Sequence, residues 1–120
     1  MNNNTFLQDR TRAFGVRIIK AYCELNRRKY DDAAKVLSKQ FLRSGTSIGA
    51  NVAEARFAQS KADYISKHSI ALKEASELDY WCKIMIDSGI VPEAKFNLIL
   101  KELNELISIL VKTIKTLKEK

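Results

Sequence analysis

The segment RSGTSIGANVAEA at residues 43–55 contains the residue types that bind phosphate groups in nucleotide-binding proteins. Two glycines, Gly45 and Gly49, stand four residues apart among hydroxyl and amide side chains, and residues 44–53 carry no charge. A Walker loop, however, requires a lysine directly after its last glycine, and a dinucleotide site requires G-x-G-x-x-G after a strand. The segment has neither pattern, and no strand-like alternation precedes it. It therefore predicts no nucleotide site.

The same segment has the periodicity of an amphipathic helix. At about 100° per residue, one face collects the apolar and glycine positions and the opposite face collects the polar ones. The first face holds Leu37, Phe41, Gly45, Ile48, Gly49, Val52 and Ala55, and the second holds Ser44, Ser47, Asn51 and Glu54. Each interior glycine destabilises a helix by about 1 kcal/mol relative to alanine, which a close helix–helix contact along small residues would offset. We therefore predict a helix-packing motif made of Gly45, Ile48, Gly49, Val52 and Ala53.

Other residues that could support catalysis or metal binding are few. His68 is the single histidine, whereas a di-iron bundle needs two Glu-x-x-His motifs. A zinc site from His68, Cys23, Cys82 and one acid has no supporting spacing, and a G-x-S-x-G elbow is absent. We expect no catalytic residues, no metal, no cofactor and no enzymatic activity. His68 is predicted to be a hydrogen-bonded core histidine, with Asp79 either as its partner or paired with a basic side chain.

The elements that would carry these residues are helices. Apolar residues recur at three- and four-residue steps almost throughout the chain, which predicts helices over about 6–28, 32–58, 61–88 and 92–118. Asp31 or Asp32 is a candidate N-cap, and Ser60 with Asp63 forms a variant of the capping box. Gly89 and Pro92 are suited to a helix stop and a first-turn start. The expected fold is a single all-α domain over residues 1–120, an antiparallel up-down four-helix bundle.

Positive charge is concentrated near the N-terminus. The formal net charge is +7, and residues 1–30 contain seven basic and two acidic side chains. Four basic residues form a stripe on the first helix, with three more close by, and the stripe contains one acid, Glu24. Such an excess favours an anionic partner, although a solvated surface is the alternative. The residues predicted to contact nucleic acid are Arg10, Arg12, Arg17, Lys20, Arg27 and Arg28.

The third helix has apolar residues on two sides. Leu72, Ala75, Cys82 and Ile86 would face the core, and Ile70, Trp81 and Ile84 lie roughly opposite. One bundle core cannot bury both sets, so we predict that Ile70, Trp81 and Ile84 form an oligomer interface. The alternative is scattered exposed apolar residues beside a half-buried tryptophan.

Three segments resemble the bacterial "four helix bundle protein" family, namely VLSKQFLRSGTSIGANVAEA (36–55), YISKHSIALKEASELDYW (64–81) and ELISILVKTIKT (105–116). This family includes proteins encoded in intervening sequences of 23S ribosomal RNA genes, sometimes called ribosomal protein S23. It is similar to the accessory protein of diversity-generating retroelements, which forms a five-fold ring of four-helix subunits and binds nucleic acid and a reverse transcriptase. The resemblance covers nearly the whole chain. The resemblance implies a homo-oligomer, specifically a pentamer. The partners that it implies are RNA or DNA and a protein such as a reverse transcriptase.

Together these features favour a non-enzymatic, ring-forming accessory protein that associates with nucleic acid through a basic surface. The alternative is an oligomeric adaptor whose basic face docks an acidic protein. A small hydrolase or metal protein has no positive feature in its favour. The N-terminus lacks the apolar run of a signal peptide, and no stretch approaches the roughly 20 apolar residues that span a bilayer. We expect a cytoplasmic protein with no membrane partner and with Cys23 and Cys82 as free, mostly buried thiols.

Overall fold

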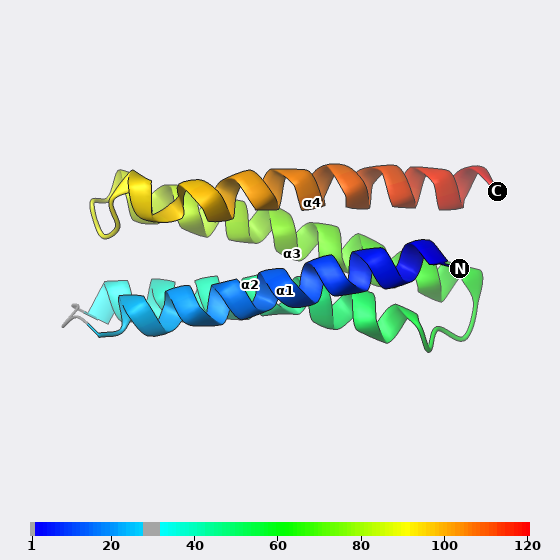
Figure 1. Cartoon of the computed structure of the whole chain (residues 1–120), viewed down its shortest axis with the longest axis horizontal. Helices are drawn as coiled ribbons and strands as arrows, with labels where there is room; N and C mark the ends of the chain where they lie inside the picture. The colour runs from blue at the N-terminus through cyan, green and yellow to red at the C-terminus, as the bar shows by residue number, and fades with distance from the viewer. Residues whose placement is uncertain (1, 28–31) are drawn as a thin grey trace.

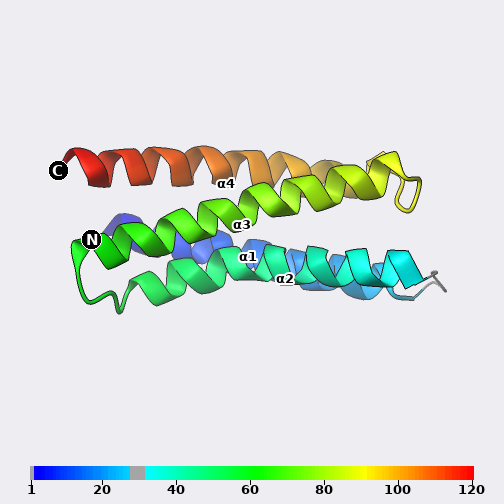
Figure 2. The same cartoon turned by 180° about the vertical axis from the view of Figure 1, so that it is seen from behind.

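The computed structural model describes residues 2–27 and 32–120, and it is an all-α, antiparallel four-helix bundle (Figures 1 and 2). Its helices are α1 (Asn2–Leu25), α2 (Asp32–Ala55), α3 (Lys61–Asp87) and α4 (Glu93–Glu119). Each helix packs against the next one in the chain, and the contact between α4 and α1 is the loosest of the four. Both chain termini and the α2–α3 loop lie at one end of the bundle, which we call the terminal end (Figure 1).

The helix boundaries differ from the predicted ones for local reasons. α1 ends at Leu25, earlier than residue 28, because the Asn26 side-chain amide donates to the Tyr22 carbonyl at 2.8 Å and the Arg27 amide turns back to the Glu24 carbonyl at 3.3 Å. α2 ends at Ala55 and is followed by three-residue turns, such as the one from the Phe57 amide to the Glu54 carbonyl. Apolar periodicity does not detect either change.

The predicted caps of α3 and α4 are present. The Ser60 hydroxyl accepts from the Asp63 amide at 3.0 Å, and the Asp63 carboxylate accepts from the Gln59 amide at 3.2 Å, which completes a capping box shifted by one residue. Gly89 has φ of +81°, the left-handed conformation that glycine adopts at a helix stop. Pro92 occupies the N-cap of α4, one position before the predicted first turn. For α2, Asp32 is the first residue, and the other cap candidate, Asp31, lies outside the described residues.

Gly45 and Gly49 form the close contact that the sequence predicted, and the neighbouring helix is α1. A Cβ atom at Gly45 would lie 2.7 Å from Cγ2 of Ile18, and one at Gly49 would lie 3.0 Å from the backbone oxygen of Thr11. Ile18 and Thr11 are themselves buried. The absence of a side chain at the two glycines therefore sets how closely α1 and α2 approach.

The close contact of the motif with α1 extends to Gly49 but not to Ala53. Ala53 was predicted in the same helix contact but is exposed, because α1 and α2 diverge toward the terminal end (Figures 1 and 2). Ser44 was placed on the polar face but is fully buried, and its hydroxyl donates to the Gln40 carbonyl at 2.8 Å. α2 packs against both α1 and α3, so the face that it buries is wider than its apolar stripe. Ile48 and Val52 are buried as expected.

The core runs the length of the bundle and draws on all four helices. Phe41 of α2 and Phe96 of α4 stack across it with ring centroids 5.2 Å apart and planes 10° apart. Cys82 is buried in this core, but Cys23, which was also expected to be mostly buried, is exposed on α1. Both cysteines are free thiols.

The glycine contact gives a stability prediction. Gly45→Leu should lower the free energy of unfolding by about 1–3 kcal/mol or more, because the added side chain meets Ile18, which has no room to move. Urea unfolding followed by circular dichroism measures the change.

Gly15 in the interior of α1 provides the matched control, since a Cβ atom there meets nothing within 4 Å. Gly15→Ala should be neutral or stabilise by up to about 1 kcal/mol through helix propensity. An unchanged urea midpoint for Gly45→Leu would contradict the tight contact.

Candidate nucleic-acid interface

The basic stripe predicted on α1 faces the edge of α4 and is partly neutralised there. Arg17 donates from Nε to Glu102 at 2.6 Å and also pairs with it through Nη2. Arg10 lies 3.0 Å from Glu105 and 3.8 Å from Glu102. These ion pairs join the two helices that pack most loosely. Arg10 and Arg17 therefore act first as intramolecular partners of α4.

The other predicted contact residues have different surroundings. Arg27 pairs with Glu24 at 3.3 Å, both on the surface near the end of α1. Arg12 and Lys20 are exposed, and neither forms an ion pair with a residue in the ranges 2–27 and 32–120. Arg28 lies outside the described residues. The structure thus separates the predicted set into paired and unpaired cations.

Exposed cations without ion pairs occur throughout the described chain, including Lys20, Lys35, Lys39, Lys73, Lys95 and Lys101, and a group of six lies at the terminal end of the bundle. These six are exposed side chains from α1, the α2–α3 loop, α3 and the last turns of α4, and none forms an ion pair within the described part of the chain. The set, which we call the basic end, consists of Arg12, Arg56, Lys61, Lys112, Lys115 and Lys118. Only Arg12 of this set was predicted from the sequence, because Arg56 and Lys61 near the α2–α3 loop and the three lysines of α4 join Arg12 only through the fold.

A groove opens on the same end, where α1 and α2 diverge. Its volume is about 1240 Å³. The side of α2 that carries glycine and alanine residues, including Gly49, Ala50 and Ala53, forms much of its floor. Arg12, Arg56 and Lys61 are its basic lining residues and Asp9 its acidic one. The groove therefore combines a floor without long side chains and a positively charged lining.

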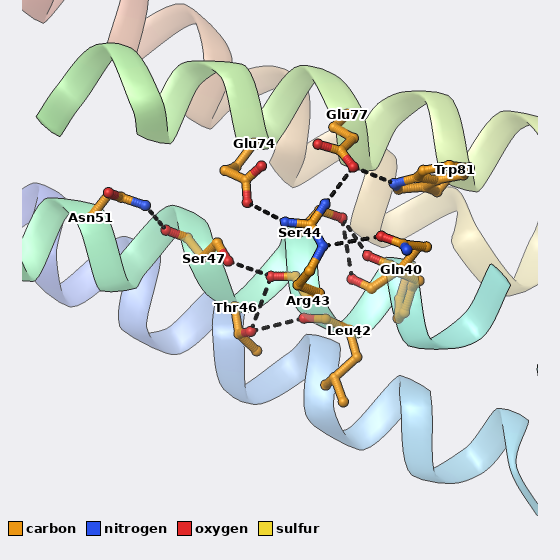
Figure 3. A network of polar contacts seen from close by, with 11 residues as sticks. Gln40, Leu42, Arg43, Ser44, Thr46, Ser47, Asn51, Glu74, Glu77 and Trp81 are labelled. Atoms are coloured by element: carbon orange, nitrogen blue, oxygen red, sulfur yellow. Dashed lines mark hydrogen bonds and ion pairs between the residues drawn. The ribbon is translucent and has the colours of Figure 1, made fainter. Parts of the chain in front are cut away.

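A polar network between α2 and α3 was not predicted at all (Figure 3). Arg43 donates from Nη1 to Glu74 at 2.8 Å and from Nη2 to Glu77, and its Nε donates to Gln40 at 3.0 Å. The Trp81 indole donates to the same Glu77 carboxylate at 3.1 Å. Glu74 and Glu77 stand three residues apart on α3, and this spacing was the only sequence signal of a shared partner.

The network shifts the pKa values of its members. The Arg43 pKa is raised, chiefly by its hydrogen bond to Glu77. Burial pushes the Glu77 pKa upward, but the hydrogen bonds from Arg43 and Trp81 outweigh burial and the Glu77 pKa is lowered. The charged forms are therefore favoured, and the network is suited to fixing α3 on α2 rather than to transferring protons.

The residues of the predicted oligomer interface are on α3, and Trp81 stands beside the contact with α2, because the Glu77 carboxylate that accepts from its indole also accepts from Arg43. Ile70 is 39% exposed, whereas Trp81 and Ile84 are half-buried, and Tyr80 adds a 56% exposed ring whose edge meets Trp81 at 5.4 Å between centroids. The Trp81 indole is held in place by Glu77. The strip thus presents an ordered aromatic pair with aliphatic residues on either side.

The remaining candidates for chemistry have structural roles. His68 is buried, and its Nδ1 donates to the Tyr64 carbonyl at 2.8 Å, as expected for a core histidine. Asp79 pairs with Lys83 at 2.8 Å, which is the second of its two predicted roles. Burial raises the pKa of the Cys82 thiol to about 12, so this thiol is not activated as a nucleophile.

Within residues 2–27 and 32–120, no three His, Cys, Asp or Glu side chains come close enough to hold a metal ion. None of the four described helices has a stretch apolar enough to cross a membrane.

These features define an all-α four-helix bundle with charged and apolar surfaces. A family model described as "23S rRNA-intervening sequence protein" matches residues 7–112. A crystal structure from Bacteroides thetaiotaomicron, described as a protein with unknown function from the S23 ribosomal protein family, is 40% identical, with a TM-score of 0.82 over 91% of this chain and 98% of that one. No curated protein sequence matches. The chain therefore belongs to the family of 23S rRNA-intervening sequence proteins.

The lowered pKa of Glu77 gives a pH-dependent prediction. A depressed carboxyl pKa stabilises the folded state above the unfolded value of 4.5, and this stability is lost as the pH falls through the folded value. Glu77→Gln should therefore lower the free energy of unfolding at pH 7 by about 1 kcal/mol, as for one charged hydrogen bond at a partly exposed site. Urea unfolding at neutral and acidic pH should show that the difference from the unmodified chain shrinks in acid.

Glu119→Gln, at the exposed end of α4, is the matched control and should change stability little at either pH. A Glu77→Gln effect of equal size at both pH values would show that shape, not charge, carries the contribution of this residue.

Proposed function

We propose that this chain is a non-enzymatic accessory protein that forms a homo-oligomer and associates with nucleic acid through a basic surface. The observation that carries the proposal is the basic end, where six exposed cations lie without carboxylate partners in the described chain. Cations already paired with carboxylates must give up those partners to bind phosphate, whereas unpaired ones need not. The name of the matching family, which refers to 23S rRNA, supports nucleic acid as the anion.

Oligomerisation would strengthen this surface. In a cyclic homo-oligomer the basic end of every subunit faces the same side, so the positive potential of one subunit is repeated around the ring. Summed potentials of several kT raise the local concentration of an anionic chain without any base-specific contact. The pentameric form follows from the family resemblance, and the apolar strip on α3 supplies a candidate interface.

Binding by the basic end should be salt-dependent and poorly sequence-specific. Arg12→Gln/Lys115→Gln should weaken binding about equally for unrelated sequences and make the slope of log affinity against log salt shallower by roughly one unit per contact. Fluorescence anisotropy with labelled RNA and DNA at several salt concentrations measures both effects.

Lys35→Gln/Lys39→Gln is the matched control, because it removes the same charge from exposed residues at the opposite end of α2. Arg17→Gln should have a smaller effect than Arg12→Gln, since Glu102 already neutralises Arg17. A larger effect of Arg17→Gln would indicate that the predicted basic stripe on α1, and not the basic end, binds nucleic acid. If neither RNA nor DNA binds at low salt with a dissociation constant below about 100 µM, the weak limit of non-specific binding, the adaptor for an acidic protein is favoured instead.

We expect the chain to form a homo-oligomer, a pentamer by the family resemblance, that is assembled through the apolar strip on α3. Ile70→Lys/Ile84→Lys places two charges in this strip without removing the indole that Glu77 holds, so it should shift the mass toward the monomer. Light scattering at micromolar concentration provides the mass.

Leu98→Lys is the control, because Leu98 is an 81% exposed apolar residue on α4 rather than on α3. A monomer mass for the unmodified chain would remove the oligomer. An intact oligomer of Ile70→Lys/Ile84→Lys would place the interface elsewhere.

A further inference from the structure

The α2–α3 loop carries an aromatic side chain that the bundle does not use. Phe57 is 80% exposed, although it lies only two residues after the buried Ala55, the last residue of α2. The guanidinium of Arg56 lies over its ring, 5.7 Å from the centroid. One exposed phenylalanine is ordinary on a protein surface. Its position between cations on a fixed loop is what calls for an explanation.

The loop around Phe57 is held in one conformation. The Phe57 amide donates to the Glu54 carbonyl at 3.0 Å, and the Ala58 amide donates to the Ala55 carbonyl at 3.1 Å. Two residues later, the capping box of Ser60 and Asp63 fixes the start of α3. The ring of Phe57 is therefore presented to solvent by a backbone that is bonded on both sides, which limits the ordering cost of binding to it.

Phe57 does not itself line the groove between α1 and α2, but its neighbours Arg56 and Ala58 do. Lys61, the first residue of α3, also lines the groove, and Arg12 lines it from α1. The groove volume of about 1240 Å³ exceeds the roughly 300–1,000 Å³ of small-molecule sites. The excess of basic over acidic lining residues matches a polyanion. A groove of this size and charge is suited to a chain of phosphates rather than to one small ligand.

We propose that the terminal end binds single-stranded nucleic acid, with an unpaired base stacked on Phe57 and the adjoining phosphates held by Arg56, Lys61 and Arg12. Single-strand binding sites combine a positively charged groove with aromatic side chains on which bases stack. In a duplex the bases already stack on one another, so an exposed ring at a loop tip gains nothing from them. This inference rests on the proposed association with nucleic acid and specifies its form.

A variant of Phe57 distinguishes an unpaired nucleic-acid base from an apolar protein pocket as its binding partner. Stacking requires a flat aromatic surface, whereas a protein pocket for Phe57 would accept an aliphatic side chain of similar size. Phe57→Leu therefore separates the two occupants. Because Phe57 is 80% exposed, the substitution should leave the fold intact, which circular dichroism checks.

The experiment uses the full chain and three labelled probes in fluorescence anisotropy at low salt. The first is an oligothymidylate of about 15 nucleotides, near the upper site size of single-strand binders. The second is an abasic strand with the same number of phosphates, and the third is a duplex of the same length. Phe57→Leu should weaken oligothymidylate binding by about fivefold or more, and Phe57→Trp should retain it. Binding of the abasic strand should not change with either variant.

Leu98→Ala is the matched control, since Leu98 is as exposed as Phe57 but lies at the opposite end of the bundle, near the start of α4. It should leave the affinity for all three probes unchanged. Equal effects of Phe57→Leu on oligothymidylate and on the abasic strand, or no effect on either, would overturn the stacking while the phosphate-based function stands. Duplex binding as tight as single-strand binding would also overturn it. Absence of binding to all three probes would instead overturn the proposed function itself.

Discussion

The close approach of α1 and α2 at two glycines is the constraint on which the other features depend. At Gly45 the space of a side chain is taken by Ile18, and at Gly49 it is taken by the backbone of Thr11. This contact fixes the rotation of α1 about its own axis, because any other rotation would bring a different side chain against the glycines. With that rotation set, Arg10 and Arg17 reach the carboxylates of α4, and Arg12 lies in the groove. A packing contact in the interior thus decides which cations are neutralised and which stay free.

The distribution of charge shows why net charge alone says little about a binding surface. On α1, Arg10 and Arg17 have carboxylate partners on α4, and beyond its end Arg27 pairs with Glu24. Exposed pairs of this kind contribute about 0–1 kcal/mol each, so the first two hold α4 beside α1 weakly while they neutralise the two arginines. The terminal end instead brings together six cations without ion pairs in the described chain, from α1, α3, α4 and the α2–α3 loop. Arg43 illustrates the opposite case, since two carboxylates and a glutamine amide hold it against α3 and remove it from any external role.

Apolar periodicity predicted the four helices and the glycine contact, because each depends on which side of one helix is apolar, and the short connections predicted the antiparallel order. It did not predict which helix meets which, so the pairing of Arg17 with Glu102 and of Arg43 with Glu74 and Glu77 was missed. The burial of Ser44 was missed for a related reason: a helix with two neighbours buries part of its polar flank, and a serine that donates to its own helix backbone is tolerated there. Helix ends were displaced by about three residues where local hydrogen bonds, such as those of Asn26, compete with further helix. The three-residue spacing of Lys112, Lys115 and Lys118 marks one side of α4 in the sequence, but these lysines come together with Arg12, Arg56 and Lys61 only in the folded chain.

The position of a cation along the bundle influences whether it meets a carboxylate of a neighbouring helix. In the middle of the bundle, Arg43 of α2 reaches Glu74 of α3 at 2.8 Å, and Arg17 of α1 reaches Glu102 of α4. Beyond the last turns the helices diverge, and side chains such as Arg56 and Lys61 no longer have a carboxylate from a neighbouring helix within reach in the described chain. The loop that connects α2 to α3 must still satisfy its own backbone, which it does through turns and a capping box. The result is a rigid backbone that carries unpaired cations and an exposed ring, and rigidity without internal partners is the condition under which a surface side chain can use its full interaction energy on a ligand.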